Sequence, residues 1–119
     1  MKDGGELTIY HNPRCSKSRA ALALLQERGV KPRVVQYLDN PPTASELRAI
    51  IDKLGIPASQ LVRKSEDVYK SKYAGRTLSD PQWIDAMVKD PILIERPIVV
   101  LGDRAILGRP PENVNSLFD

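Results

Sequence analysis

Residues 7–18 read Leu-Thr-Ile-Tyr-His-Asn-Pro-Arg-Cys-Ser-Lys-Ser, and along this stretch the sequence changes from strand-like to helix-like. Residues 7–10 alternate and are rich in β-forming types, which predicts a strand. Turn-forming Asn and Pro come next. Residues 16–28 then predict a helix that Gly29 ends. One face of this helix is expected to carry Ala20, Ala21, Leu24 and Leu25. Cys15 therefore lies at a junction of strand, loop and helix.

Further elements are expected along the rest of the chain, each bounded by Pro, Gly or a capping residue. They are a strand at 33–38, a helix at 44–54 with a capping box at 43–46 and a stop at Gly55, one or two short helical segments at 57–68, a helix from 79–81 to about 89, a hairpin of strands 97–101 and 104–107, and a short final helix opening at 110–112.

The order of these elements is typical of one fold class. A β-α-β unit followed by helices, a β-hairpin and a last helix matches the thioredoxin and glutaredoxin class. We therefore expect an α/β fold with a mixed four-stranded sheet flanked by helices. The extra helices form a helical insertion before the C-terminal hairpin.

The size of the chain bounds its organisation. With 119 residues and 13.3 kDa, residues 1–119 are expected to form a single domain, with residues 7–118 as the ordered core. The longest apolar stretch, at 20–25, is too short for a membrane span. We see no secretory signal. A cytoplasmic protein with no membrane partner is predicted, and the lack of an obvious exposed apolar stripe favours a monomer.

Charge and cysteine content exclude several kinds of site. One Cys and one His cannot supply a usual structural zinc site or a disulfide framework, so we expect no bound metal. A net charge of +3 with one Trp, four Tyr and one Phe does not indicate a nucleic-acid partner. Gly-rich fingerprints for nucleotide cofactors are absent from the sequence, and no bound cofactor is expected.

Cys15 is the first candidate for chemistry. At a helix N-terminus the free N–H groups and the helix dipole stabilise a thiolate, and Arg14, Lys17 and Arg19 would act in the same direction. A lone cysteine is more often a small buried hydrophobe, but the neighbours of this one are polar and basic. Ser18 stands where a dithiol oxidoreductase has its resolving cysteine, so redox turnover would need an external thiol. An ordinary helix-start role for Ser18 stays open.

Three arginines form a second candidate site, namely Arg63, Arg96 and Arg109. If their guanidinium groups converged, they would bind a tetrahedral oxyanion, because the planar guanidinium group donates two hydrogen bonds to a pair of such oxygens. Sequence alone does not show convergence. Pro97 opens an apolar strand and is either a plain trans residue or the cis proline of the thioredoxin class. His11 would tune the thiolate or simply be hydrogen-bonded.

Five motifs then connect these residues. They are Ile-Tyr-His-Asn-Pro-Arg-Cys at 9–15, Tyr-Leu at 37–38 with Pro-Pro-Thr at 41–43, Leu-Val-Arg-Lys at 61–64, Pro-Ile-Leu-Ile-Glu-Arg-Pro-Ile-Val-Val at 91–100, and Gly-Arg-Pro at 108–110. In this order and spacing they resemble the ArsC family, the glutathione- and glutaredoxin-coupled arsenate reductases of bacteria. The resemblance covers essentially residues 7–118.

The resemblance implies a role for each matched position. Cys15 takes the place of the nucleophile, and His11 that of the histidine just upstream of it. Substrate binding is implied for Arg63, Arg96, Arg109 and Asn12, and a structural place beside the site for Pro97. The implied reaction is attack of Cys15 on arsenate to form a thioarsenate. Glutathione, as co-substrate, and glutaredoxin, as partner, then resolve this adduct and release arsenite.

Alternatives stay open at this point. Arg14 and Lys17 would either sharpen oxyanion binding or serve an anionic thiol such as glutathione. The same site would also suit a glutathione-dependent thiol reductase with another substrate. A non-catalytic regulator, like the RNA-polymerase-binding members of the superfamily, fits less well because Ser18 replaces the second cysteine of their redox switch. A low-molecular-weight phosphatase is excluded, since its Cys-x5-Arg loop would need an arginine where Ala21 stands.

Overall fold

The computed structural model describes residues 6–118, which divide into two compact units. The first, here called the sheet unit, comprises the described residues up to Asn40 and from Arg96 onward. The second, the helical unit, is Pro41–Glu95. The helical unit is the insertion expected before the hairpin. The expectation of a single domain stays a prediction.

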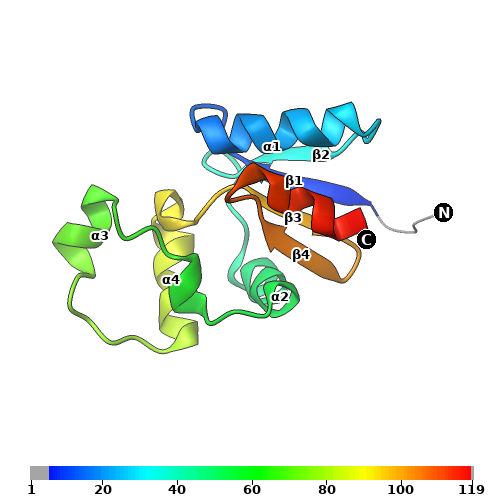
Figure 1. Cartoon of the computed structure of the whole chain (residues 1–119). Helices are drawn as coiled ribbons and strands as arrows, with labels where there is room; N and C mark the ends of the chain where they lie inside the picture. The colour runs from blue at the N-terminus through cyan, green and yellow to red at the C-terminus, as the bar shows by residue number, and fades with distance from the viewer. Residues whose placement is uncertain (1–5, 119) are drawn as a thin grey trace. The chain divides into compact units, whose positions relative to one another are not determined.

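The sheet unit is built on a four-stranded sheet, which can be followed in Figure 1. Its strands are β1 (Leu7–His11), β2 (Arg33–Gln36), β3 (Ile98–Leu101) and β4 (Arg104–Leu107), in the order β2-β1-β3-β4. β1 runs parallel to β2 and antiparallel to β3, and β3 pairs antiparallel with β4. This mixed sheet with its flanking helices confirms the predicted thioredoxin-like α/β fold.

One face of the sheet is covered by α1 (Ser16–Glu27) and by η3 (Pro111–Phe118), a 3-10 helix. Side chains from both helices and from β1 and β3 form a buried cluster of Leu7, Ile9, Ala21, Leu25, Val99, Val114 and Leu117. The predicted apolar face of α1 is partly wrong, because Ala20 is exposed and Ser18 is buried instead. The rotation of α1 on the sheet thus turns a polar side chain inward beside the Cys15 loop.

The helical unit contains α2 (Ala44–Leu54), α3 (Asp67–Lys72) and α4 (Asp80–Lys89), together with two short 3-10 helices, η1 (Ala58–Leu61) and η2 (Pro91–Leu93). Capping boxes begin α2 and α4, at Thr43 and Ser79, and the first of these is the predicted one. α4 packs against α2, η1 and η2. Its Trp83, Ile84 and Met87 are buried, as expected of core residues.

The segment predicted as short helices at 57–68 is only partly helical. η1 ends at Leu61, and Val62 instead pairs with Ile94 in an isolated antiparallel bridge. The backbone N–H of Arg63 donates to the Leu93 carbonyl over 2.7 Å, which secures this pairing. A contact between distant parts of the sequence therefore overrides the local helical tendency. It also sets the backbone of Arg63 in place.

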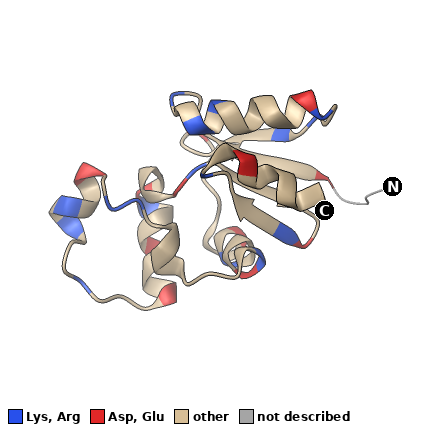
Figure 2. Ribbon diagram, in the orientation of Figure 1, with Lys and Arg blue, Asp and Glu red and all other residues tan. Residues whose placement is uncertain are grey.

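Lys and Arg lie interspersed with Asp and Glu along the ribbon of both units (Figure 2). Of the helices within residues 6–118, none is long and apolar enough to span a membrane.

Candidate functional site

The loop between β1 and α1 is held by its own polar groups. The N–H of Cys15 donates to the Asn12 carbonyl over 3.0 Å, and the N–H of Arg14 donates to Oδ1 of Asn12 over 3.0 Å. Nη1 of Arg19 reaches back from α1 to the Pro13 carbonyl, 2.9 Å away. Asn12 is buried and thus serves as the internal brace of the turn. Cys15 follows as the N-cap residue of α1, with an extended backbone conformation.

The position of Cys15 at the start of α1 lowers the pKa of its thiol. Burial acts against this by raising the pKa, but backbone hydrogen bonds from Ser18 and Lys17 and the nearby Arg96 guanidinium outweigh it. N–H groups at a helix start and a neighbouring cation both stabilise a thiolate. The thiol is partly exposed, so reagents can reach it. These are the conditions for a nucleophilic cysteine.

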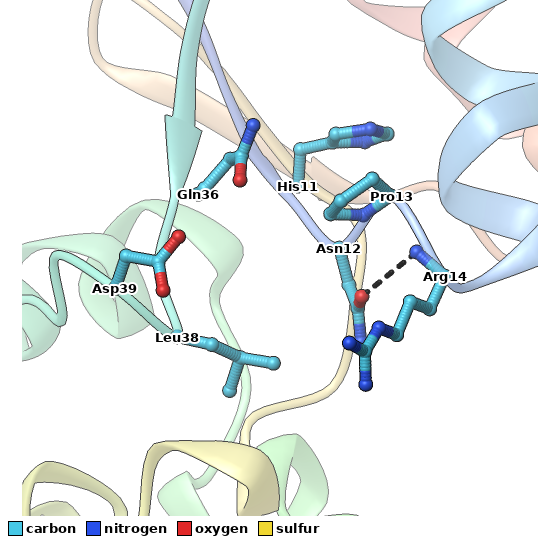
Figure 3. A pocket seen from close by; sticks show the side chains of 7 residues that line it. All are labelled: His11, Asn12, Pro13, Arg14, Gln36, Leu38 and Asp39. Carbon is cyan, nitrogen blue, oxygen red and sulfur yellow. Dashed lines mark hydrogen bonds between the residues drawn. The ribbon is translucent and has the colours of Figure 1, made fainter.

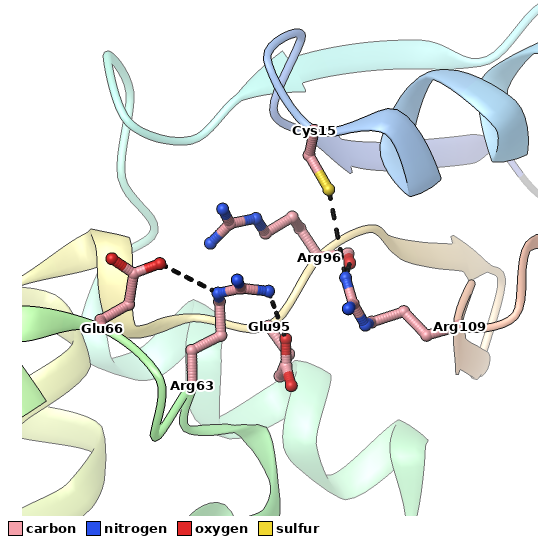
Figure 4. Close-up of polar contacts among 6 residues, drawn as sticks. All are labelled: Cys15, Arg63, Glu66, Glu95, Arg96 and Arg109. Carbon is pink, nitrogen blue, oxygen red and sulfur yellow. Dashed lines mark hydrogen bonds and ion pairs between the residues drawn. The ribbon is translucent and has the colours of Figure 1, made fainter.

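Two of the three predicted arginines lie in the sheet unit together with Cys15. Nη1 of Arg109 lies 4.0 Å from Sγ of Cys15, and the same nitrogen donates to the Arg96 carbonyl over 3.1 Å (Figure 4). The Arg109 carbonyl in turn accepts a hydrogen bond of 3.1 Å from the Asn113 side chain in η3. Arg96 itself is buried. The structure thus brings two cations, from segments far apart in sequence, to the thiol.

Arg63 belongs to the helical unit, where two carboxylates hold its guanidinium. Nε donates to Glu66 and Nη1 to Glu95, each over 3.1 Å (Figure 4). Burial lowers the pKa of Arg63, and the two carboxylates more than offset this, so that the pKa is raised. The predicted convergence of Arg63 with Arg96 and Arg109 on one anion stays a prediction.

Ser18 has a role that sequence reasoning missed. It is fully buried, and its Oγ accepts a hydrogen bond of 3.0 Å from the Asn12 N–H. The same Oγ lies 2.9 Å from Nδ1 of His11. Burial, and then the charge of Arg19, lower the pKa of His11, so the neutral ring is favoured and Nδ1 can accept the Ser18 proton. Ser18 is therefore a link between β1, the loop and α1.

Pro97 packs closely against the β4 end of the sheet unit. Its carbonyl accepts a hydrogen bond of 2.9 Å from the Gly108 N–H. A Cβ atom at position 108 would lie 2.8 Å from Cγ of Pro97 and 3.2 Å from Cβ of Ala21. Only glycine fits there without displacing its neighbours. The Arg96–Pro97 peptide bond, whose isomer the sequence left open, is cis, and so is the bond between Arg109 and Pro110.

The assembled groups suit the covalent capture of an oxyanion. A thiolate-forming cysteine supplies the nucleophile, and the adjacent guanidinium groups can bind negatively charged oxygens. Within residues 6–118, His, Cys, Asp and Glu side chains nowhere gather in a group of three that could hold a metal ion.

Comparisons with known proteins agree with this architecture. The family model of the ArsC family matches residues 10–117. The Escherichia coli (strain K12) protein YfgD, described as uncharacterized, is 51% identical over 111 residues, covering 92% of this chain and 93% of that protein. An arsenate reductase of Neisseria meningitidis (strain MC58) is 46% identical over 115 residues, covering 95% of this chain and 98% of the relative.

Among solved structures, an arsenate reductase from Vibrio cholerae superposes with a TM-score of 0.90 at 44% sequence identity. The match covers 94% of this chain and 97% of that one. The family model spans most of the chain, and close relatives match along nearly their whole length. The chain belongs to the ArsC family.

Proposed function

We propose that this protein is an oxidoreductase that reduces arsenate to arsenite, with Cys15 as nucleophile and with glutathione and glutaredoxin as the source of electrons. The observation that carries the proposal is the placement of the Cys15 thiol at the N-terminus of α1, 4.0 Å from Nη1 of Arg109. The arsenate reductases among its relatives support arsenate as the oxyanion. Dependence on external thiols suits the reducing cytoplasm, where we expect the protein to act.

The first step is attack of the Cys15 thiolate on arsenic. An arsenic–sulfur bond forms and one arsenate oxygen leaves as water, while arsenic keeps its oxidation state of five. In this proposal Arg96 and Arg109 bind the negative charge on the remaining oxygens. Fixed cations near developing charge lower the barrier of such steps. In this proposal Arg63 is the third anion-binding group, and it would exchange a carboxylate partner for the substrate.

The reducing equivalents come from two thiols. Glutathione adds to arsenic of the thioarsenate, and a second oxygen leaves as water. A glutaredoxin thiolate then attacks the glutathione sulfur, forming a mixed disulfide. The electron pair of the broken arsenic–sulfur bond stays on arsenic, which becomes trivalent. Water finally displaces Cys15 and releases arsenite. Since Ser18 provides no second thiol, the chain cannot form a disulfide with itself.

His11 and Asn12 act on this chemistry through the loop in our proposal. Asn12 braces the turn that presents Cys15, and His11 sits behind it on Ser18. Both are buried, which suits positioning of the nucleophile.

A coupled assay tests the proposal. The purified chain is incubated with arsenate, glutathione, glutaredoxin and a reductase that recycles oxidised glutathione, and arsenite is quantified directly. We expect turnover by the natural chain and background rates for Cys15→Ser, because a hydroxyl is a poor nucleophile here. Ser16→Ala, next to the site but exposed, serves as the control and should keep its activity. A Cys15→Ser variant as active as the natural chain would refute the proposal.

A further inference from the structure

A cavity of about 330 Å³ lies beside the Cys15 loop, wholly within the sheet unit. The side chains of His11, Asn12, Pro13 and Arg14 line one side, and those of Gln36, Leu38 and Asp39 line the other (Figure 3). Its volume is in the range of small-molecule sites. The mechanism proposed above makes no use of it.

The cavity lies where a ligand site is expected in a sheet of this kind. β1 and β2 run parallel, with His11 paired to Gln36, so their carboxyl ends meet at one edge. Open α/β sheets bind ligands outside the carboxyl ends of their strands. The turn after β2 is fixed there, because the N–H groups of Asp39 and Asn40 both donate to the Gln36 carbonyl, over 3.0 and 2.9 Å. Asp39 is therefore held on a defined turn.

The two sides of the cavity carry side chains of opposite charge that do not form an ion pair with each other. Arg14 is exposed on the loop side and Asp39 is exposed on the β2 side. Both are described residues, and no ion pair joins them. Among the uncharged lining residues, Asn12 uses its side-chain oxygen for the Arg14 N–H, which leaves its amide NH₂ group as a donor. Leu38, 41% exposed, adds apolar surface to the same cavity.

A cation and an anion facing one cavity match a ligand that is itself a zwitterion. An α-amino-acid group carries an ammonium and a carboxylate on one carbon, and its ammonium would pair with Asp39 while its carboxylate pairs with Arg14. A simple oxyanion would gain nothing from Asp39 and would be repelled by it. The charge pattern therefore favours an amino-acid group over a second oxyanion.

Arg14 also links this cavity to the nucleophile. It precedes Cys15 directly, and consecutive Cα atoms are ~3.8 Å apart. A tripeptide is at most about 10 Å long when extended. A peptide thiol anchored by its amino-acid end at Arg14 and Asp39 would thus have its sulfur within range of Cys15.

We propose that this cavity binds the α-amino-acid end of the thiol co-substrate, with Asp39 holding its ammonium group and Arg14 its carboxylate. The inference rests on the proposed function, because it supposes that an external peptide thiol attacks the adduct on Cys15. It assigns Asp39 and Arg14 to recognition of the thiol and leaves the oxyanion to Arg96 and Arg109.

The test uses two unreactive ligands and the full natural chain. S-methylglutathione keeps the amino-acid end but has no free thiol, and N-acetyl-S-methylglutathione lacks the ammonium charge as well. Dissociation constants are measured by calorimetry or NMR titration. We expect N-acetylation to weaken binding to the natural chain by about 1.5-fold to fivefold, which is the effect of losing one exposed charge pair. Asp39→Asn should weaken S-methylglutathione by the same factor and leave the N-acetyl ligand unaffected.

Arg14→Gln should weaken both ligands, because both keep the carboxylate. Asp103→Asn and Lys31→Gln are matched controls, since both residues are exposed in the sheet unit and do not line the cavity. These two variants should bind both ligands with the affinity of the natural chain. No measurable binding of S-methylglutathione, or equal affinities for the natural chain and Asp39→Asn, would overturn the inference.

A separate measurement distinguishes failure of this inference from failure of the proposed function. Arsenate alone, without any thiol, should protect Cys15 from alkylation if the first step occurs. If arsenate protects Cys15 while ligand binding does not depend on Asp39, the cavity assignment is overturned and the proposed arsenate reduction still stands. Lack of protection together with binding that depends on Asp39 would support the amino-acid site and refute arsenate as the substrate.

Discussion

The Ser18 hydroxyl lies 2.9 Å from Nδ1 of His11, and through it the first turn of α1 is tied to the end of β1. The same oxygen accepts the Asn12 N–H. The hydroxyl has one proton to give and lone pairs to receive, so it can satisfy both buried groups at once. The loop that presents Cys15 is therefore braced from behind by a residue of the helix that it precedes.

Replacing Ser18 by Ala should destabilise the protein. The buried Asn12 N–H and His11 Nδ1 would both lose their partner, and each unsatisfied buried polar group costs about 1–3 kcal/mol. Urea unfolding followed by circular dichroism measures the loss. Ser16→Ala, an exposed position of the same turn, should change stability by less than about 0.5 kcal/mol. Equal stability of the two variants would contradict this role of Ser18.

The Cys15 thiol should be alkylated faster at mildly acidic and neutral pH than an unfolded-state cysteine. Only the thiolate reacts, and the folded protein lowers the pKa of Cys15. Rates of reaction with iodoacetamide are measured against pH, for the native chain and in urea. The midpoint should be lower in the native chain, and Arg96→Gln should move it upward. Coinciding native and unfolded midpoints would contradict thiolate stabilisation.

The lowered pKa of Cys15 also predicts how the stability of the protein depends on pH. The native state favours the thiolate form of Cys15. The thiolate therefore adds to the free energy of unfolding at pH values above the pKa that the thiol has in the unfolded chain. This contribution is lost as the pH falls through the lower, folded pKa. Cys15→Ser should remove this part of the pH dependence, as measured by urea midpoints between pH 5 and about 10. If Cys15→Ser has the same pH profile as the natural chain, the Cys15 thiolate does not contribute to stability in this way.

Two substitutions of Arg96 should show whether activity needs only its positive charge or also the paired donors of its guanidinium group. Arg96→Ala is expected to lower the arsenate reduction rate by about 10²–10³-fold, the usual effect of removing one group that stabilises anionic charge. Arg96→Lys should recover only part of the rate, because lysine lacks the paired donors of the guanidinium group. Arg33→Ala, exposed on β2, is the control. Equal rates for the Ala and Lys variants would argue against paired hydrogen bonding to the oxyanion.

Gly108→Ala should destabilise the protein through a steric clash. The added Cβ would lie 2.8 Å from Cγ of Pro97 and 3.2 Å from Cβ of Ala21, and overpacking of this kind costs about 1–3 kcal/mol. The loss is read from urea unfolding. A Gly108→Ala variant as stable as the natural chain would contradict the clash.

Local patterns were enough to predict most of the secondary structure. Alternation at β1 and the capping box at Thr43 act over a few residues, and both elements form where the sequence predicts them. The segment at 57–68 behaves differently, because Val62 pairs with Ile94 across the helical unit. Local propensity contains no information about such a partner.

The sequence by itself determined the fold class, the place of Cys15 at the start of a helix and the presence of Ser18 where a second cysteine would stand, since each depends on neighbours along the chain. The tertiary structure decided that Arg109 approaches Cys15, that Ser18 is buried against His11, and that Asp39 faces the cavity lined by Arg14. These relationships join segments that only folding brings together. Their geometry depends on how α1 and the strands pack, and no short-range pattern encodes that packing.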